Sequence, residues 1–441
     1  MSVVDTKYPD RYDTPKEKFA LDIEDLGNFK YDMQHCIKCK GCYWVDHTYM
    51  PGMKYATRCP ENTWKGFDSY GAFGKMRIGL KMLEGKMDWS DHLLEIIYAD
   101  PMCGACDVGC KRNLDLETGL TLEALRVKAV QDGAAPLPNH KKILDNVLRT
   151  GNCFGNTNER QAWANDLKLH EKAETLYYVG DNTAYGSPEV AKATAKILQT
   201  IGVDFTILKD EKNTGLDFKA AGDIPGARKL AKEALEQVRA TGCKTLVVSD
   251  GEVYRSWKAG VPQVLNIATA DLGFNVKHIM ELAVEALEDG RLVFKTTFES
   301  TIAYHDCCSV SRTCDDWTPY EGERGWMGMV YPRLRRRRGR QGLYEAPRKI
   351  LEAVPGAIMT EFIRTRENTM CCAVSGGVKY NFPELAKFAS GNRLEEARDC
   401  GIQTIVCGSV ECRNNFNRTL AAEGDRSMKA IDITELIVAA L

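Results

Sequence analysis

Two kinds of hydrophobic pattern divide the chain. Between residues 31 and about 170, apolar residues recur at helical spacing, most clearly in Tyr70–Leu94 and Leu120–Gln131. From about Glu174 onward, short β-branched runs alternate with amphipathic stretches. The runs are 176–180, 203–208, 244–249 and 276–279, and the stretches include 189–200 and 227–241. This alternation is typical of βαβ units, so we predict an α/β protein with a helical N-terminal module and mostly parallel sheets.

An internal repeat runs through the α/β part. Residues 235–257 align with 394–416 at a constant offset of 159 positions, and 176–208 is similar to 302–362. Two copies of one α/β module, at about 174–275 and 298–425, account for this similarity. We therefore expect the same scaffold to occur twice.

Composition excludes several classes of function. The 441 residues are 44% hydrophobic and 27% charged, as in ordinary globular proteins. Because 59 basic residues are balanced by 61 acidic ones, charge gives no reason to expect nucleic acid or a membrane surface as a partner. No window approaches 18 consecutive apolar residues, which argues against membrane insertion, and the first residues lack the apolar segment of a secretory signal. We therefore predict a cytoplasmic protein.

The unusual feature is the number of cysteines, which is 17. In the cytoplasm thiols are kept reduced, so a disulfide scaffold is not expected. A chain of this length also buries core enough to fold without such bonds. The cysteines are therefore expected to be metal ligands or reactive groups.

Seven cysteines form two groups in the helical module. The groups are Cys36-x2-Cys39-x2-Cys42 with a later Cys59-Pro60, and Cys103-x2-Cys106-x3-Cys110. Three thiolates on a tight loop with a distant Cys-Pro are the ligand pattern of a [4Fe–4S] cluster. Zinc is the alternative, but a zinc knuckle takes two pairs of ligands, and the triple leaves one thiol over.

The two groups together resemble a two-cluster bacterial ferredoxin module. The resemblance implies one [4Fe–4S] cluster on Cys36, Cys39, Cys42 and Cys110, and a second on Cys59, Cys103 and Cys106. Sixteen residues (43–58) lie ahead of Cys59, a longer loop than the ferredoxin pattern has. Asp100 stands where the second group should have its fourth cysteine. Asp100, a water, a distant cysteine such as Cys153 or an open iron would each complete that site.

Further cysteines occur in three segments of the second α/β copy. These are HDCCSVSR at 305–312, TMCCAVSGG at 369–377 and VCGSVEC at 406–412. Since the carboxyl ends of parallel strands meet in one crevice, we expect the segments to converge. The vicinal pair Cys371-Cys372 cannot easily place both thiolates on one corner of a cubane, and it suits a cluster in which a thiolate bridges irons.

The repeat and these segments resemble the cysteine-rich CCG domain of the B/D-type catalytic component of heterodisulfide reductase. Ala373 stands where the name CCG has glycine. A ferredoxin module ahead of two CCG copies matches the D-type layout, and relatives include the electron-transfer subunit of class II benzoyl-CoA reductase complexes. The polar, charged residues 1–30 predict an extended arm, and the resemblance predicts a ferredoxin-like module at 31–170, a degenerate CCG repeat at 171–290 and a cluster-binding CCG repeat at 291–441.

The resemblance also implies a noncubane [4Fe–4S] cluster held by five cysteines. Four of these positions are matched by Cys308, Cys371, Cys372 and Cys412. The fifth is Ser409, so Cys407 or Cys307 is a candidate substitute, and an ordinary cubane is the alternative. The first copy has approximately Asp181, Asn213, Thr214 and Val253 at the four matched positions, which predicts a structural or docking role.

An insertion at 313–340 separates Cys308 from Cys371. It holds Trp317, Trp326, Met327, Met329 and an arginine-rich run at 333–340. A solvated charged face is one interpretation. A docking hairpin for an acidic partner, or a clamp over an anionic substrate, is the other.

Two functional hypotheses follow from the resemblance. The chain is either an electron-transfer subunit that connects a flavin-containing partner to the C-terminal cluster, or a catalytic subunit that reduces a disulfide there. His305 is the candidate proton donor to a product thiolate, the alternative being a hydrogen bond within its loop. No GxGxxG or Walker A sequence occurs, so flavin is assigned to a partner, and a membrane cytochrome is a further candidate partner. The missing fifth cysteine favours electron transfer.

Overall fold

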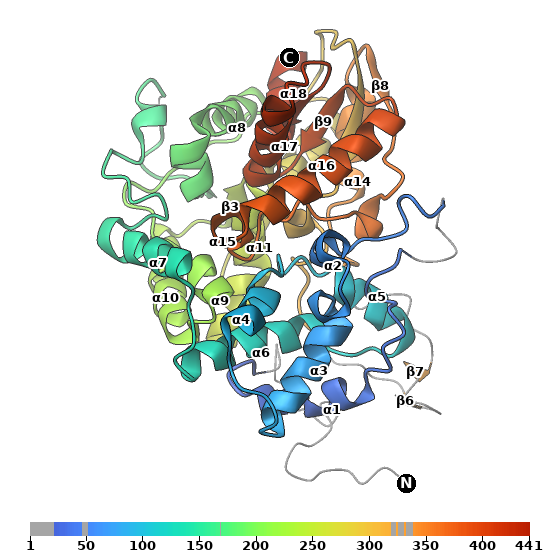
Figure 1. The fold of residues 1–441 in the computed structure, drawn as a ribbon. Coiled ribbons are helices and arrows are strands. Elements are labelled where there is room, and N and C mark those ends of the chain that lie inside the picture. Colours follow the sequence, from blue (N-terminus) through green and yellow to red (C-terminus); the bar gives the residue numbers. More distant parts are fainter. Residues whose placement is uncertain (1–21, 46–51, 168, 319–322, 325–329, 332–337) are drawn as a thin grey trace.

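A computed structural model of the chain describes residues 22–45, 52–167, 169–318, 323–324, 330–331 and 338–441 (Figure 1). Most of the predicted arm at 1–30 lies outside the described residues. So do Trp326, Met327, Met329 and positions 333–337 of the predicted insertion. In the described part, no helix is long and apolar enough to cross a bilayer.

Helices build the N-terminal part, as predicted, and lie together at the lower end of Figure 1. Short 3₁₀ or π segments are labelled η. The elements are η2 (Leu26–Phe29), α1 (Lys30–His35), α2 (Pro60–Lys65), η3 (Asp68–Tyr70), α3 (Ala72–Leu83), α4 (Asp91–Tyr98), α5 (Ala105–Asn113), α6 (Thr118–Gln131) and α7 (Pro138–Thr150). The short η4 (Ala162–Ala164) leads into the α/β part.

The stretch Tyr70–Leu94 does not form one continuous helix, although its apolar spacing is helical throughout. Helix α3 ends just before Gly85, which has a φ of +66°. Helix α4 begins after Ser90, whose hydroxyl accepts a hydrogen bond from the Leu93 amide at 3.2 Å. A left-handed glycine ends one helix and a serine N-cap starts the next, so these two local signals override the periodicity.

Each α/β copy contains a four-stranded parallel sheet. The first copy consists of β1 (Thr175–Tyr177), η5 (Asn182–Gly186), α8 (Pro188–Thr200), β2 (Phe205–Thr206), α9 (Leu216–Ala221), α10 (Ile224–Thr241), β3 (Thr245–Val248), α11 (Gly251–Arg255), η6 (Ser256–Gly260), α12 (Val261–Leu265), η7 (Thr269–Leu272), β4 (Asn275–His278) and α13 (Ile279–Glu288). Its strand order is β2-β1-β3-β4, with Leu176 opposite Leu246. The four predicted strands are all confirmed, three of them shortened.

The second copy repeats this order as β8-β5-β9-β10. It consists of β5 (Ser300–His305), η8 (Cys308–Val310), α14 (Glu345–Ala353), β8 (Ala357–Met359), η10 (Arg366–Asn368), α15 (Val378–Asn381), α16 (Pro383–Asp399), β9 (Thr404–Cys407), α17 (Val410–Glu423), β10 (Lys429–Asp432) and α18 (Ile433–Ala440). Within the insertion, β6 (Glu323–Arg324) pairs antiparallel with β7 (Val330–Tyr331). The equal strand order confirms that one scaffold occurs twice.

The two copies pack against each other reciprocally. Helix α8 of the first copy contacts α18 of the second, and the equivalent helices α14 and α13 make the same contact with the copies exchanged. Likewise α11 contacts η8, and α17 contacts η5. The Val410 amide donates to the Asp250 carboxylate at 3.1 Å, which joins the residues that follow the two central strands β3 and β9. The arrangement is that of a pseudo-two-fold axis, with the carboxyl ends of β3 and β9 facing each other.

Arg126 of α6 fastens the helical part to both copies. Its buried guanidinium donates to the carbonyls of Ala220 at 2.7 Å, Gly376 at 2.8 Å and Asp100 at 2.5 Å. The apolar core of the helical part also includes Ala373 of the second copy. The helical part and the second copy therefore share an apolar core. This packing brings close together the cysteine groups that were predicted in separate modules.

Candidate metal centres

The predicted C-terminal residues converge at the carboxyl ends of β5 and β9. His305 is the last residue of β5 and lies opposite Cys407, the last residue of β9. Cys308 opens η8, Cys412 lies in the first turn of α17, and the vicinal pair lies on the loop before α15. All of these side chains are buried, as is that of Cys307. The structure therefore brings together every C-terminal residue that the sequence proposed.

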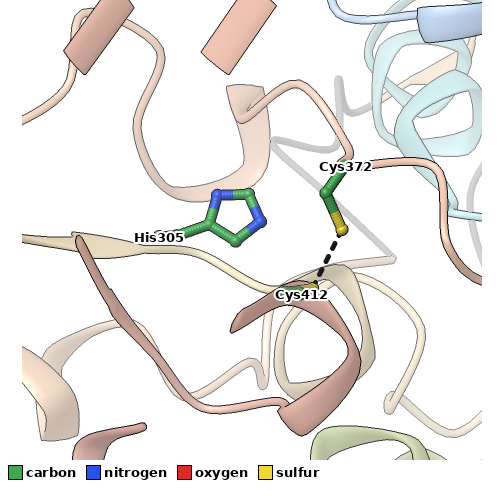
Figure 2. Close-up of side chains that lie close together, drawn as sticks. All are labelled: His305, Cys372 and Cys412. Carbon is green, nitrogen blue, oxygen red and sulfur yellow. Dashed lines mark hydrogen bonds between the residues drawn. The ribbon is translucent and has the colours of Figure 1, made fainter. Parts of the chain in front are cut away.

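Two sulfur contacts define the geometry of this group. The Sγ atoms of Cys372 and Cys412 lie 3.0 Å apart, and His305 points toward them, with its ligand atom and the two sulfurs all within 4.8 Å of one another (Figure 2). On the other side of the vicinal pair, the Sγ atoms of Cys371 and Cys308 lie 3.9 Å apart. Cys371 and Cys372, which are adjacent in the chain, thus face different partner cysteines. This arrangement is expected of two ligands that bind different irons of one cluster.

Hydrogen bonding among the thiols separates their pKa values. Hydrogen bonds with Cys371 and Cys412 lower the pKa of Cys372 well below its ordinary value. Hydrogen bonds to Cys103, Cys308 and Cys372 raise the pKa of Cys371 well above it. Against the effect of burial, hydrogen bonds with Cys407 and Cys412 also lower the pKa of Cys307 well below its ordinary value. Cys372 and Cys307 are therefore both favoured as thiolates, which is the form that binds iron.

Cys103 of the helical part reaches this same group. It clusters with Ala105, Cys308 and Cys371. A hydrogen bond from Cys371, together with the charge of Arg312, lowers the pKa of Cys103 to about 7 against the effect of burial. The two cysteine groups that are predicted to hold separate clusters therefore meet at a sulfur–sulfur contact.

Arg312 lies between the two groups and was not singled out by the sequence. Its Nε donates to the Cys103 carbonyl at 3.1 Å, and its Nη1 donates to the carbonyls of Glu367 at 3.1 Å and of Thr369. Its charge acts on the thiols of Cys103, Cys308 and Cys371. The only sequence signal for this role is that arginine ends the segment HDCCSVSR.

The first cysteine group of the helical part lies nearer the surface. Cys39 is exposed, while Cys42 is buried. Burial, reinforced by the neighbouring thiols, raises the pKa of Cys42 to about 12. Gly109 of α5 lies so close to this loop that a Cβ there would be 2.2 Å from the Gly41 carbonyl, so only glycine fits. This contact holds α5, which carries Cys110, against the loop that ends in Cys42.

The second group of the helical part lines a cavity. Cys59, Cys103 and Cys106 share its wall with Asp100 and with Glu61, which sequence reasoning missed. Cys153, a candidate for the missing ligand, does not line this cavity. Its amide instead bonds Asp181 at 2.9 Å in the first copy, where its thiol is buried.

A buried lysine holds the two carboxylates of this cavity. Lys75 Nζ donates to Asp100 at 2.7 Å and to Glu61 at 3.3 Å, and the lysine is fully buried. Burial opposes ionisation of Asp100, but Lys75 holds the pKa of Asp100 below its ordinary value. Burial raises the pKa of Glu61 to about 8. Lys75 thus supplies positive charge where three thiols and two carboxyl groups gather.

The donor sets fit iron–sulfur clusters better than zinc. Thiolates are the ligands that such clusters take from proteins. The C-terminal group offers six sulfurs and one imidazole within a buried site, more than the four ligands of a structural zinc ion. The cavity of the helical part offers three thiols and two carboxyl groups. No described cysteine forms a disulfide.

The first copy retains a cavity without the cysteines. Its wall includes Asp181, Asn213, Thr214 and Val253, which stand approximately at the four positions that carry cysteines in the second copy, and residues of the second copy complete it. Two ion pairs lie along this wall: Arg160 bonds Asp181 at 2.7 Å, and Lys379 bonds Glu411, both of the second copy, at 2.6 Å. The ligands were lost from the first copy, but the hollow at their position was kept.

Comparison with known protein families agrees with the repeat. The family model described as "Cysteine-rich domain", CCG, matches residues 177–252 and again 334–417. The chain carries two CCG cysteine-rich domains. Cys371, Cys372, Cys407 and Cys412 lie within the second matched segment, whereas Cys308 lies ahead of it.

Named relatives extend the similarity over the whole chain. The D-type component of the dihydromethanophenazine:CoB–CoM heterodisulfide reductase of Methanosarcina acetivorans is 24% identical over 96% of this chain and 97% of its own. A probable iron-sulfur-binding oxidoreductase, FadF, of Bacillus subtilis is 26% identical over 78% of this chain and 46% of its own. One subunit of the fumarate reductase (CoM/CoB) of Methanothermobacter marburgensis is 22% identical over 78% of this chain and 61% of its own. The names of all three describe redox enzymes or subunits of such enzymes.

Proposed function

We propose that the chain is an iron–sulfur electron-transfer subunit of a larger oxidoreductase complex. Two [4Fe–4S] clusters in the helical module would take electrons from a flavin-containing partner and pass them to a [4Fe–4S] cluster on the second CCG domain. The names of the relatives, which include subunits of reductase complexes, support this proposal. When bound, such clusters accept and release one electron at a time.

The contact of Cys103 with Cys371 and Cys308 carries the proposal. A ligand of the second module cluster would lie against two ligands of the C-terminal cluster, so electrons would cross through touching sulfur atoms. Arg312 lies at this contact and compensates the negative charge of the thiolates there. The exposure of the cysteines supports electron flow from the helical module to the CCG domain, because Cys39 is accessible to a partner whereas the CCG cysteines are buried.

The test follows electrons through the chain. A reduced flavodoxin, which as a protein cannot reach the buried CCG site directly, is mixed anaerobically with the iron-loaded protein. Rapid-freeze EPR then follows reduction of each cluster. We expect the CCG cluster to be reduced after the module clusters, and Cys106→Ala to slow its reduction at least tenfold while leaving iron on the CCG domain.

Cys243→Ala is the matched control. Cys243 is buried just before β3, at the amino end of that strand, whereas the C-terminal group gathers at the carboxyl ends of strands, so its removal should change neither iron content nor rate. If the CCG cluster of Cys106→Ala were reduced as fast as that of the unaltered protein, the relay would be refuted. Zinc in place of iron and sulfide would refute both cluster assignments.

A second candidate function is reduction of a disulfide at the CCG site. His305 favours it, because its buried Nδ1 has no hydrogen-bond partner among the described residues and its ring lies beside Cys372 and Cys412. Reduction of one disulfide consumes two electrons and two protons and yields two thiols. His305 would deliver a proton to one product thiolate. The test measures turnover of a mixed thiol disulfide with a chemical electron donor. If the unaltered protein turns it over, and His305→Gln slows turnover at least tenfold without changing the iron content, the chain is a disulfide reductase and not a relay alone.

A further inference from the structure

The second cysteine group of the helical module lacks one thiol. A [4Fe–4S] cluster takes four protein ligands, and only Cys59, Cys103 and Cys106 line the cavity. Four acidic residues share that wall, namely Glu61, Asp100, Asp107 and Glu123. The hydrogen bonds of each decide which carboxylate is free to bind iron.

Asp100, at the position of the missing cysteine, is already engaged through both oxygens. Its Oδ2 accepts from Lys75 at 2.7 Å, and its Oδ1 accepts from the Met102 amide at 2.8 Å. The second bond fixes the backbone turn that leads to Cys103. A carboxylate that binds iron would have to give up one of these bonds inside a buried site.

Two other carboxylates of the wall are also engaged. Asp107 Oδ1 accepts from the Thr118 hydroxyl at 2.7 Å and from the Gly119 amide at 3.0 Å. Glu123 is paired with Lys219 and accepts from Gln263 at 2.8 Å. Each therefore has a structural task that holds α6 or α9 in place.

Glu61 differs because one of its oxygens has no partner. The residue is 4% exposed, and Oε2 is buried without a hydrogen bond among the described residues. Its other oxygen accepts from Lys75 at the longer distance of 3.3 Å. A buried, unpartnered carboxylate oxygen is costly in a folded protein unless it binds something.

We propose that Glu61 is the fourth ligand of the second module cluster and that Asp100 is a positioning residue for Lys75. Glu61 follows Cys59 by two residues, so one turn at the start of α2 supplies two of the four ligands. Lys75 offsets the negative charge that a carboxylate ligand adds. This assignment rests on the proposed function, because it requires the helical module to hold iron.

The experiment compares Glu61→Gln with Asp100→Asn and Asp107→Asn in the full-length protein, loaded with iron and sulfide under anaerobic conditions. Iron per chain and EPR of the oxidised and reduced states are measured, and circular dichroism checks folding. We expect Glu61→Gln to lose one iron per chain and to show the EPR signal of an oxidised three-iron cluster. Both aspartate variants should keep the iron content of the unaltered protein.

Glu61→Cys is the rescue variant and also serves if Glu61→Gln does not fold. It should retain the four-iron cluster and shift its reduction potential, because a thiolate replaces a carboxylate. A full iron content and unchanged EPR spectrum in Glu61→Gln, or an unchanged potential in Glu61→Cys, would overturn the assignment. Loss of iron in Asp100→Asn or Asp107→Asn alone would do so too. An unaltered protein without iron in the helical module would overturn the proposed function itself, and with it the assignment.

Discussion

Gly377→Ala tests how the loop of the vicinal cysteines is seated against the helical part. Gly377 has a φ of +77°, and a Cβ built on it would lie 1.9 Å from His140 Nε2. His140 lies on α7, is 3% exposed, and stacks at a tilt against Tyr98 with ring centroids 5.2 Å apart. Because the ring is buried against Tyr98, we expect the substitution to displace the ring, the loop or α7.

The expected cost has two parts. An alanine in the left-handed region costs about 1–2 kcal/mol more than glycine. Overpacking a buried contact adds about 1–3 kcal/mol. Gly377→Ala should therefore lower the free energy of unfolding by about 2–5 kcal/mol, and it should loosen the loop that carries Cys371 and Cys372.

Urea unfolding followed by circular dichroism measures this cost, and two alanine substitutions separate its parts. Gly401 has a φ of +68°, but a Cβ built on it would meet no described atom within 4 Å, so Gly401→Ala should show the backbone cost alone. Gly391 lies inside α16 with only an ordinary 3.7 Å contact, so Gly391→Ala should be neutral or stabilise by up to about 1 kcal/mol.

A double variant completes the test. Adding His140→Ala to Gly377→Ala removes the clashing ring, so the two changes together should cost less than the sum of the single changes, by about 1–3 kcal/mol. If Gly377→Ala were no more costly than Gly401→Ala, or if the two changes were simply additive, the packing of His140 would not be what seats this loop.

Three further predictions concern buried charge and strain. Lys75→Met leaves two buried carboxyl groups without their counter-ion and should lower the free energy of unfolding in urea by about 3–5 kcal/mol. Lys81→Met removes a lysine from an exposed ion pair and should lower it by less than about 1 kcal/mol. Equal costs for the two variants would contradict the buried network. Burial raises the pKa of Asp250 from 3.8 to about 7, so the folded state takes up a proton that the unfolded state does not, and stability should fall as pH rises from about 4 to 7. Asp250→Asn should make that slope shallower and gain at most about 4 kcal/mol at pH 8, while the buried carboxyl groups of Glu61, Asp217 and Asp432, whose pKa values burial also raises, keep part of the slope. An unchanged pH profile would refute the shift. Ala373 has a φ of +56°, so Ala373→Gly should raise the thermal midpoint by relieving about 1 kcal/mol of strain, and a lower midpoint would contradict this.

Local patterns in the sequence predicted the scaffold well. The runs at 176–180 and 244–249 became neighbouring strands because buried parallel strands need near-continuous apolar sequence. The repeat predicted a second sheet of the same kind, and the equal strand order confirms it. The helical stretch at 70–94 was less well predicted, because Gly85 and Ser90 end and start helices regardless of apolar spacing.

Contacts between distant parts of the chain could not be predicted in the same way. The sequence proposed the seven cysteines of the helical module and those near residue 308 as separate groups. Nothing local indicates that Cys103 meets Cys371, which lies 268 positions later, because that contact depends on how α6 docks on both copies. The roles of Arg312 and Lys75 share this origin, since both are ordinary basic residues until their buried partners are known.

The cavity kept by the first CCG domain bears on how such proteins diverge. Its wall includes Asp181, Asn213, Thr214 and Val253, and ion pairs between side chains lie along it. The two copies have the same strand order, although the side chains at this place differ. One scaffold can therefore present a group of cysteines in one copy and a wall of ordinary polar side chains in the other.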